Sequence, residues 1–179
     1  PSEIFTTEFK DLLDYEPDLL IELTAEEELA FEMISKAMEK GVHIVTANKA
    51  VVSSYFEDLL QLAEEHQVKF LYESSVGGCI PILKTIKEER IFNDITEVSG
   101  ILNGTCNFIL SSMMAEKADY DDVLKEAQDL GFAEADPTAD VSGLDSLRKL
   151  RILLSLAFQG KVLEEDILLE GIEKIKLKD

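Results

Sequence analysis

Three short apolar runs, separated by segments of helical periodicity, constrain the fold more than any other feature of this sequence. The runs are residues 19–23, 42–46 and 68–72, and each is short and apolar enough to form a buried strand. Between them, residues 25–40 and 53–66 repeat apolar side chains at helical spacing. Strands that alternate with helices indicate a parallel sheet with helices packed against it. The first part of the chain is therefore predicted to be an α/β unit.

The periodicity changes after Glu73, where helical segments become dominant. One run, residues 95–102, has the apolar pattern of a strand. Helices are predicted at residues 80–89, 105–116, 120–130, 144–158 and 164–175. We therefore expect an α/β domain at residues 1–75, followed by a helix-rich α+β domain at residues 76–179.

Composition excludes several classes of function. The formal net charge is −20, whereas nucleic acids and anionic membrane surfaces bind to basic patches, so neither is an expected partner. No apolar run approaches the roughly 20 residues that span a bilayer, and the N-terminus has no signal-peptide pattern, so a cytoplasmic protein is expected. The two cysteines lack the spacing of metal ligands, which favours reduced thiols.

Residues 131–149 concentrate charged side chains between glycines and a proline. Asp145 and Lys149 stand four residues apart at the start of an apolar helical segment, so one face of that helix carries an acid and a base. The pair is either an acid/base site or a solvated salt bridge of the kind that contributes little. In the preceding loop, Glu134 and Asp140 add carboxylates, which repel one another unless a positive charge lies among them. That charge is either Lys149 or a cationic ligand.

The turn after the second predicted strand is expected to bind a ligand, because open parallel sheets bind ligands at the carboxyl ends of their strands. Thr24 and Ala25 follow the first strand, and Asn48 and Lys49 follow the second. Two of these residues also have a plainer interpretation. Thr24 could cap the next helix, and Lys49 could be a solvated surface charge.

Two glycine-containing segments also follow predicted strands. Residues 73–81 contain two glycines and a proline, a composition that either turns backbone carbonyls around a hard cation or makes a tight turn into a helix. Residues 100–110 leave a strand through Asn103 and Gly104 and enter a helix that Thr105 is expected to cap. We interpret this second segment as architecture around a pocket.

The charged run resembles the signature of the homoserine dehydrogenases, which interconvert L-aspartate 4-semialdehyde and L-homoserine with a nicotinamide cofactor. Other characteristic segments of that family are matched, in the family's order, by residues 45–50, 72–81, 100–110 and 170–172. Several motifs in the right order are far more specific than any one of them. The resemblance covers essentially residues 19–175.

The resemblance implies a role for each candidate residue of the site. Lys149 matches the proton donor, and Lys49 would assist the reaction from the nucleotide side. Glu134 and Asp145 match carboxylates that bind the substrate ammonium group, with Asp140 supporting them. The expected partner is therefore a small amino-acid substrate.

The resemblance also implies the groups that bind. NADP or NAD would be held by Thr24, Ala25, Lys49 and Gly131. A sodium-type cation would be held by oxygens of Glu73, Val76, Gly78 and Ile80. The family further implies a homodimer or homo-oligomer and a place in threonine, methionine and isoleucine biosynthesis.

The sequence departs from the family in two ways. It contains no Gly-x-Gly-x-x-Gly turn, which is the usual phosphate cradle of a dinucleotide-binding domain. Cys79 stands where the family more often has Gly or Ala, and Cys106 stands where it usually has Thr. The resemblance therefore implies a partial Rossmann-like sheet within an internal fragment of the enzyme, inactive on its own. The alternative is a noncatalytic fragment or a dimerisation module.

Overall fold

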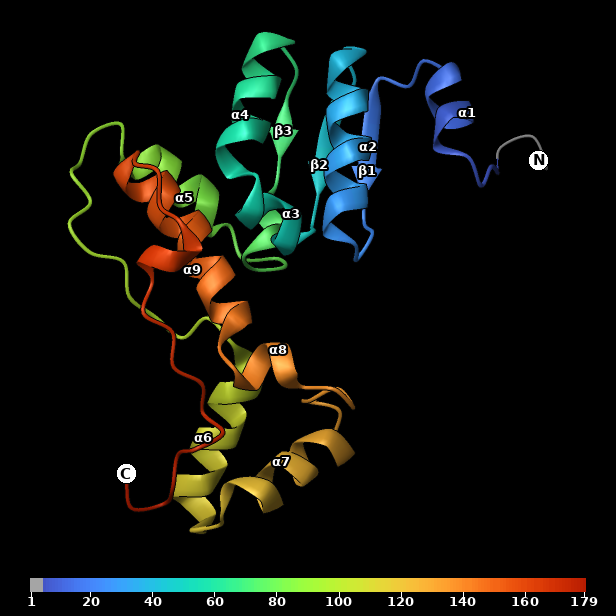
Figure 1. Cartoon of the computed structure of the whole chain (residues 1–179). Coiled ribbons are helices and arrows are strands. Elements are labelled where there is room, and N and C mark those ends of the chain that lie inside the picture. The colour runs from blue at the N-terminus through green and yellow to red at the C-terminus, as the bar shows by residue number, and fades with distance from the viewer. Residues whose placement is uncertain (1–4) are drawn as a thin grey trace. The chain divides into compact units, whose positions relative to one another are not determined.

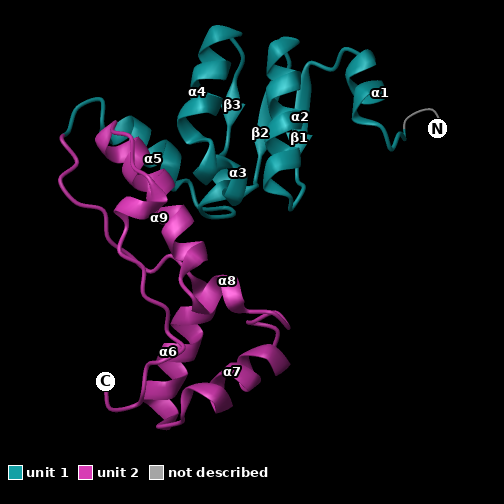
Figure 2. Ribbon diagram, in the orientation of Figure 1, with its two compact units in different colours: residues 1–93 teal, residues 94–179 magenta. Residues whose placement is uncertain are grey.

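The computed structural model describes residues 5–179 and divides the chain into two compact units, residues 1–93 and 94–179 (Figure 2). The units divide later in the chain than the predicted domain boundary, because α5 (Ile82–Glu89) packs with the turn that follows the sheet. Within the described range, no helix is long and apolar enough to cross a membrane.

The first unit is built on a parallel sheet of three strands (Figure 1). The strands are β1 (Leu19–Glu22), β2 (His43–Thr46) and β3 (Phe70–Leu71), in the order β1-β2-β3. Glu22 lies opposite Thr46 in the register, so the carboxyl ends of β1 and β2 lie side by side. The three predicted strands and their parallel arrangement are confirmed.

Two helices cover one side of this sheet. α2 (Glu27–Glu39) packs against β1 and β2, while α4 (Phe56–Glu65) packs against β3 and against α2. The buried residues of α2 recur at helical spacing: Ala30, Ile34, Ala37 and Met38. Because side chains alternate along a strand, Ile21 and Leu71 point to the other side, where they are 59% and 52% exposed. That face of the sheet is open.

Two details of this unit differ from the prediction. The single helix predicted at residues 53–66 is two helices, α3 (Lys49–Ser54) and α4. Asn48 causes the earlier start, because its side chain accepts two backbone N–H groups of the first turn of α3. α1 (Phe9–Asp14) has no counterpart in the prediction.

The second unit is helical. α6 (Gly104–Glu116) and α7 (Tyr120–Asp129) pack against each other, and α8 (Thr138–Val141) contacts both α6 and α9 (Leu144–Phe158) (Figure 1). A buried core cluster consists of Ile109, Met113, Val123, Ala127, Ala133 and Val141. The three longer helices confirm the predicted ones, with nearly the same bounds.

Two predicted elements of this unit are wrong. Residues 95–102 form no strand; each strand within residues 5–179 lies in the first unit, so this extended segment has no neighbouring strand to pair with. Residues 164–175 contain only a 3₁₀ turn, Glu164–Asp166. The chain after this turn runs close to α8 instead of coiling, and the amide of Ile172 donates to the carbonyl of Val141 at 2.8 Å.

Candidate active site

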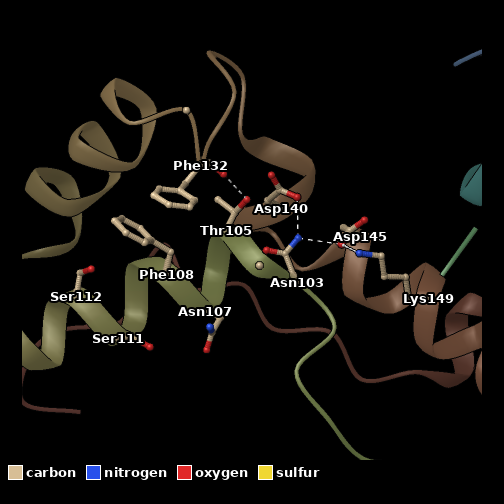
Figure 3. Close-up of a pocket in the computed structure, with 12 residues that line it drawn as sticks. Asn103, Thr105, Asn107, Phe108, Ser111, Ser112, Phe132, Asp140, Asp145 and Lys149 are labelled. Carbon is tan, nitrogen blue, oxygen red and sulfur yellow. Dashed lines mark hydrogen bonds and ion pairs between the residues drawn. The ribbon is translucent and has the colours of Figure 1, made fainter. Parts of the chain in front are cut away.

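A cavity of about 650 Å³ opens in the second unit beside the N-terminal ends of α6 and α9 (Figure 3). The stacked rings of Phe108 and Phe132, with centroids 4.4 Å apart, line one part of it. Four residues of the predicted site also line it: Gly131, Asp140, Asp145 and Lys149. Folding thus gathers three charged side chains of this run, Asp140, Asp145 and Lys149, around one cavity.

Asp145 and Lys149 form a largely buried ion pair on the first turns of α9. Lys149 Nζ lies 2.8 Å from Asp145 Oδ2, and the side chains of lysine and aspartate are 19% and 5% exposed. The same Nζ donates to the carbonyl of Leu102 at 2.8 Å. The pair is therefore a salt bridge, but not the solvated one of the plainer interpretation.

Asn103 begins α6 and faces this ion pair. Its Oδ1 accepts the backbone N–H of Cys106 at 2.7 Å, which makes Asn103 the N-cap of the helix. The prediction that Thr105 caps this helix is wrong, because the Thr105 hydroxyl donates to the carbonyl of Phe132 at 2.8 Å. Asn before a helix start is a recognisable signal for a cap, but nothing in the sequence shows what the rest of the Asn103 side chain contacts.

Asp140 is tied to the start of α6 by two bonds. Its Oδ1 accepts from Asn103 Nδ2 at 2.7 Å, and its carbonyl accepts from the thiol of Cys106 at 3.2 Å. Asn103 Nδ2 also donates to Asp145 Oδ2 at 2.9 Å, so this amide lies between the two carboxylates (Figure 3). Burial raises the pKa of the Cys106 thiol, and the negative charges of Asp140 and Asp145 add to the effect. The thiol therefore stays protonated at neutral pH and remains a donor.

The loop between α7 and α8 carries Gly131 and Glu134. Gly131 has a φ of +79°, a conformation that favours glycine, and its place on the cavity wall lets a ligand approach the backbone. Glu134 is exposed and does not line the cavity. Its carbonyl accepts from Gln128 Nε2 at 3.1 Å, which fixes the backbone of the loop. The substrate-binding role of Glu134 stays a prediction.

In the first unit, the buried carboxylate of Glu22 joins the ends of β1 and β2 by hydrogen bonds. It accepts the amide and hydroxyl of Thr24 at 2.6 and 2.7 Å and also the hydroxyl of Thr46. Asn48 Nδ2 adds a bond to the carbonyl of Thr24 at 3.0 Å. The interpretation of Thr24 as a helix cap is wrong, because Glu26 occupies the N-cap position of α2.

Ala25 and Lys49 follow the turns that these hydrogen bonds join. Ala25 is exposed, and Lys49 is the half-buried first residue of α3. Both turns lie at the carboxyl edge of the sheet, which is where parallel sheets bind ligands. Together with Thr24, these residues lie just after β1 and β2, and their cofactor contacts stay predictions.

The segment predicted to bind a monovalent cation forms the turn from β3 into α5. The Glu73 carboxylate accepts two backbone amides at the start of α5, at 2.8 and 3.0 Å. The carbonyl of Ile80 accepts the amide of Ile82 at 2.8 Å. Val76 and Gly78 lie in the turn between Glu73 and Ile80. Residues 5–179 contain no cluster of three His, Cys, Asp or Glu side chains suited to a metal. A cation here would depend on carbonyl oxygens, and the site stays a prediction.

These features define a class of protein: an α/β protein with a parallel sheet, whose carboxyl edge is the usual place for a ligand, and a helical unit that carries a charged cavity. Two family models identify the member of that class. The model for the NAD binding domain of homoserine dehydrogenase matches residues 1–73, and the model for homoserine dehydrogenase matches residues 81–179. The chain belongs to the homoserine dehydrogenase family.

Individual relatives agree with this assignment. Homoserine dehydrogenases from Synechocystis sp. and Bacillus subtilis are each 46% identical to the chain over its whole length, and the chain spans 42% of each of them. The crystal structure of the Thiobacillus denitrificans homoserine dehydrogenase matches with a TM-score of 0.93 at 43% identity, over 97% of this chain and 41% of that one. A hyperthermophilic archaeal homoserine dehydrogenase mutant in complex with NADPH matches with a TM-score of 0.88 at 28% identity, over 96% of this chain and 53% of that one. The predicted fold class is confirmed.

Proposed function

We propose that this sequence carries the substrate pocket and part of the nucleotide edge of an enzyme that reversibly reduces L-aspartate 4-semialdehyde to L-homoserine with NADP or NAD. The observation that supports the proposal best is the largely buried Asp145–Lys149 pair on the wall of a cavity that Asp140 also lines. Because the chain spans 42% of its curated relatives, the activity is proposed for a protein that contains the whole enzyme.

Lys149 would hold and move the proton of the reaction. Reduction of an aldehyde creates an alkoxide oxygen, which needs a proton donor within hydrogen-bond reach. Asp145 Oδ2 and the carbonyl of Leu102 engage two of the three N–H donors of the ammonium group, each at 2.8 Å. The third N–H has no protein partner among the described residues and would donate to the substrate oxygen. An ammonium group fixed in this way needs little reorganisation when the proton is transferred.

Asp140 and Asp145 would bind the ammonium group of the substrate. Charge-assisted hydrogen bonds from an ammonium to carboxylates are roughly twice as strong as neutral ones, and both residues line the cavity. Glu134 would add a third carboxylate from the exposed loop. Such binding would orient the amino acid so that its aldehyde carbon faces the cofactor.

When bound, the nicotinamide supplies the hydride. We propose Thr24, Ala25 and Lys49, at the carboxyl edge of the sheet, as contacts of the dinucleotide, and the family resemblance also implies a contact from Gly131. A relative solved in complex with NADPH supports a nicotinamide dinucleotide as the cofactor. The family resemblance supports three further proposals: a sodium-type cation, a homodimer or homo-oligomer, and a place in threonine, methionine and isoleucine biosynthesis. The cytoplasmic location is a proposal from the sequence pattern.

A chimera tests the proposed activity. Residues 1–179 would replace the matching segment of the Bacillus subtilis relative, and the oxidation of NADPH and NADH with aspartate 4-semialdehyde would be measured. Lys149→Arg keeps the charge that pairs with Asp145 but holds its proton too tightly to donate it. This variant should lower kcat by about 10² to 10⁴, the range for loss of a general acid. The matched control, Lys36→Arg, changes an exposed lysine of another i,i+4 pair and should leave kcat unchanged.

Three results would count against the proposal or part of it. Lys149→Arg with wild-type kcat would refute the proton-donor role. A chimera that dimerises but neither turns over nor binds homoserine would favour the alternative of a noncatalytic module. The 179-residue chain alone is predicted to show no NADPH oxidation with aspartate 4-semialdehyde, and turnover by the pure chain would contradict that prediction.

A further inference from the structure

We propose that Asn103 is a positioning residue whose amide group holds Asp140 and Asp145 side by side, so that both carboxylates face one bound ammonium group. The inference rests on the proposed function, because it takes the ligand of the cavity to be an amino acid. Asn103 acts through the two acids and needs no contact with the ligand.

The helix cap fixes which way the Asn103 amide faces. The side chain is buried, and its Oδ1 accepts the backbone N–H of Cys106 at 2.7 Å. Only the oxygen of an amide can accept from an N–H group. The NH₂ group must therefore point the other way, where it reaches Asp140 Oδ1 at 2.7 Å and Asp145 Oδ2 at 2.9 Å. Capping of α6 therefore orients both of these bonds.

The two hydrogen bonds from Asn103 Nδ2, which we call the bridge, offset the repulsion between the Asp140 and Asp145 carboxylates. Neighbouring carboxylates repel each other unless a donor or a cation stabilises their charged forms. The Lys149 ammonium group pairs with Asp145. Within residues 5–179, the side chain of Asp140 has Asn103 as its hydrogen-bond partner and no other. Without this bond, repulsion from Asp145 would turn the Asp140 carboxylate away, although the Cys106 thiol would still hold its backbone carbonyl.

Loss of the bridge should therefore weaken the binding of ligands that carry an ammonium group. Homoserine has this group, whereas 4-hydroxybutanoate has the same carbon chain, hydroxyl and carboxylate without it. A positioning role predicts lower affinity for homoserine alone. A merely structural role predicts that both ligands lose affinity to the same extent, because the whole cavity would loosen.

Asn103→Ser separates the bridge from the cap. Serine is about as good an N-cap as asparagine, but its single hydroxyl cannot accept from Cys106 and also donate to both carboxylates. Asn93→Ser is the matched control. It removes another amide-to-carboxylate bond, from Asn93 Nδ2 to Glu89 Oε2 at 2.8 Å, on the exposed surface of the first unit.

Both ligands would be titrated calorimetrically into the 179-residue chain and its two variants. Asn103→Ser should weaken homoserine binding about tenfold, as expected for a lost hydrogen bond to a charged group, and leave 4-hydroxybutanoate binding unchanged. Asn93→Ser should change neither affinity. Equal losses for the two ligands, or no loss for homoserine, would overturn the positioning role.

A second measurement keeps this inference separate from the proposed function. If the wild-type chain binds neither ligand, the amino-acid site fails, but the bridge can still be tested. NMR coupling constants report the χ1 rotamer of Asp140 in the free chain. The rotamer should be fixed in the wild type and averaged in Asn103→Ser, and an unchanged rotamer would overturn the bridge itself.

Discussion

The burial of the Asp145–Lys149 pair predicts a large loss of stability when the acid is removed. Asp145→Ala deletes the bond from Lys149 Nζ at 2.8 Å and the bond from Asn103 Nδ2 at 2.9 Å. Removing one partner of a buried pair costs about 3–5 kcal/mol, because the other charge stays buried without compensation. The Lys149 side chain is 19% exposed and keeps the carbonyl of Leu102 as a partner. We therefore expect the lower end of the range, about 3 kcal/mol.

A matched pair on α2 supplies the control. Glu32 and Lys36 have the same i,i+4 spacing with the acid first, but their side chains are 59% and 54% exposed. Exposed helical pairs of this kind contribute only about 0.3–0.5 kcal/mol, so Glu32→Ala should cost no more than that. The two substitutions are alike in sequence terms and differ in burial.

Urea denaturation followed by amide NMR signals can measure both costs separately. Signals from α9 report on the second unit and signals from α2 on the first, and linear extrapolation gives the free energy of unfolding of each. The reasoning is refuted if Asp145→Ala costs the second unit no more than Glu32→Ala costs the first.

Three further predictions concern other groups in the chain. The buried Tyr72 hydroxyl has no hydrogen-bond partner within residues 5–179, so Tyr72→Phe should leave stability at pH 7 unchanged or raise it by up to about 1 kcal/mol in urea denaturation. Burial raises the pKa of Tyr72 to about 12, so the wild type should lose stability as the pH rises from about 10, the unfolded value, and Tyr72→Phe should lose less. Alkylation at pH 8, followed by mass spectrometry, should modify the exposed Cys79 well before Cys106, whose pKa burial raises; equal rates would contradict this. Gly171→Ala should lower the melting temperature, because the new Cβ would lie 2.7 Å from a backbone oxygen of α8. Such an overlap costs about 1–3 kcal/mol. Gly160→Ala is the control, because outside the adjoining residues its new Cβ would lie no nearer than 3.9 Å to any atom of residues 5–179.

The sequence alone determined the fold class and the family. Alternating strand and helix patterns between residues 19 and 72 specify a parallel sheet, because the apolar period is a local property of the chain. The ordered motifs that end in Asp145 and Lys149 specify the family, and residue spacing alone puts these two side chains on one face of α9. The predicted strand at residues 95–102 and the predicted helix at residues 164–175 were wrong, because the conformation of each segment depends on which other segments it contacts. A strand needs a second strand to pair with, and the segment after Glu164 is hydrogen-bonded to α8 through the amide of Ile172.

Only the tertiary structure decided which of two identical i,i+4 spacings is a buried pair and which is a surface pair. It also brought the Asn103 amide within hydrogen-bond distance of two carboxylates, which lie 37 and 42 residues further along the chain. Spacing along the chain fixes which side chains are neighbours within one helix. Burial, and bonds across such separations, depend on how α6, α8 and α9 pack, and no local pattern of residues encodes that packing.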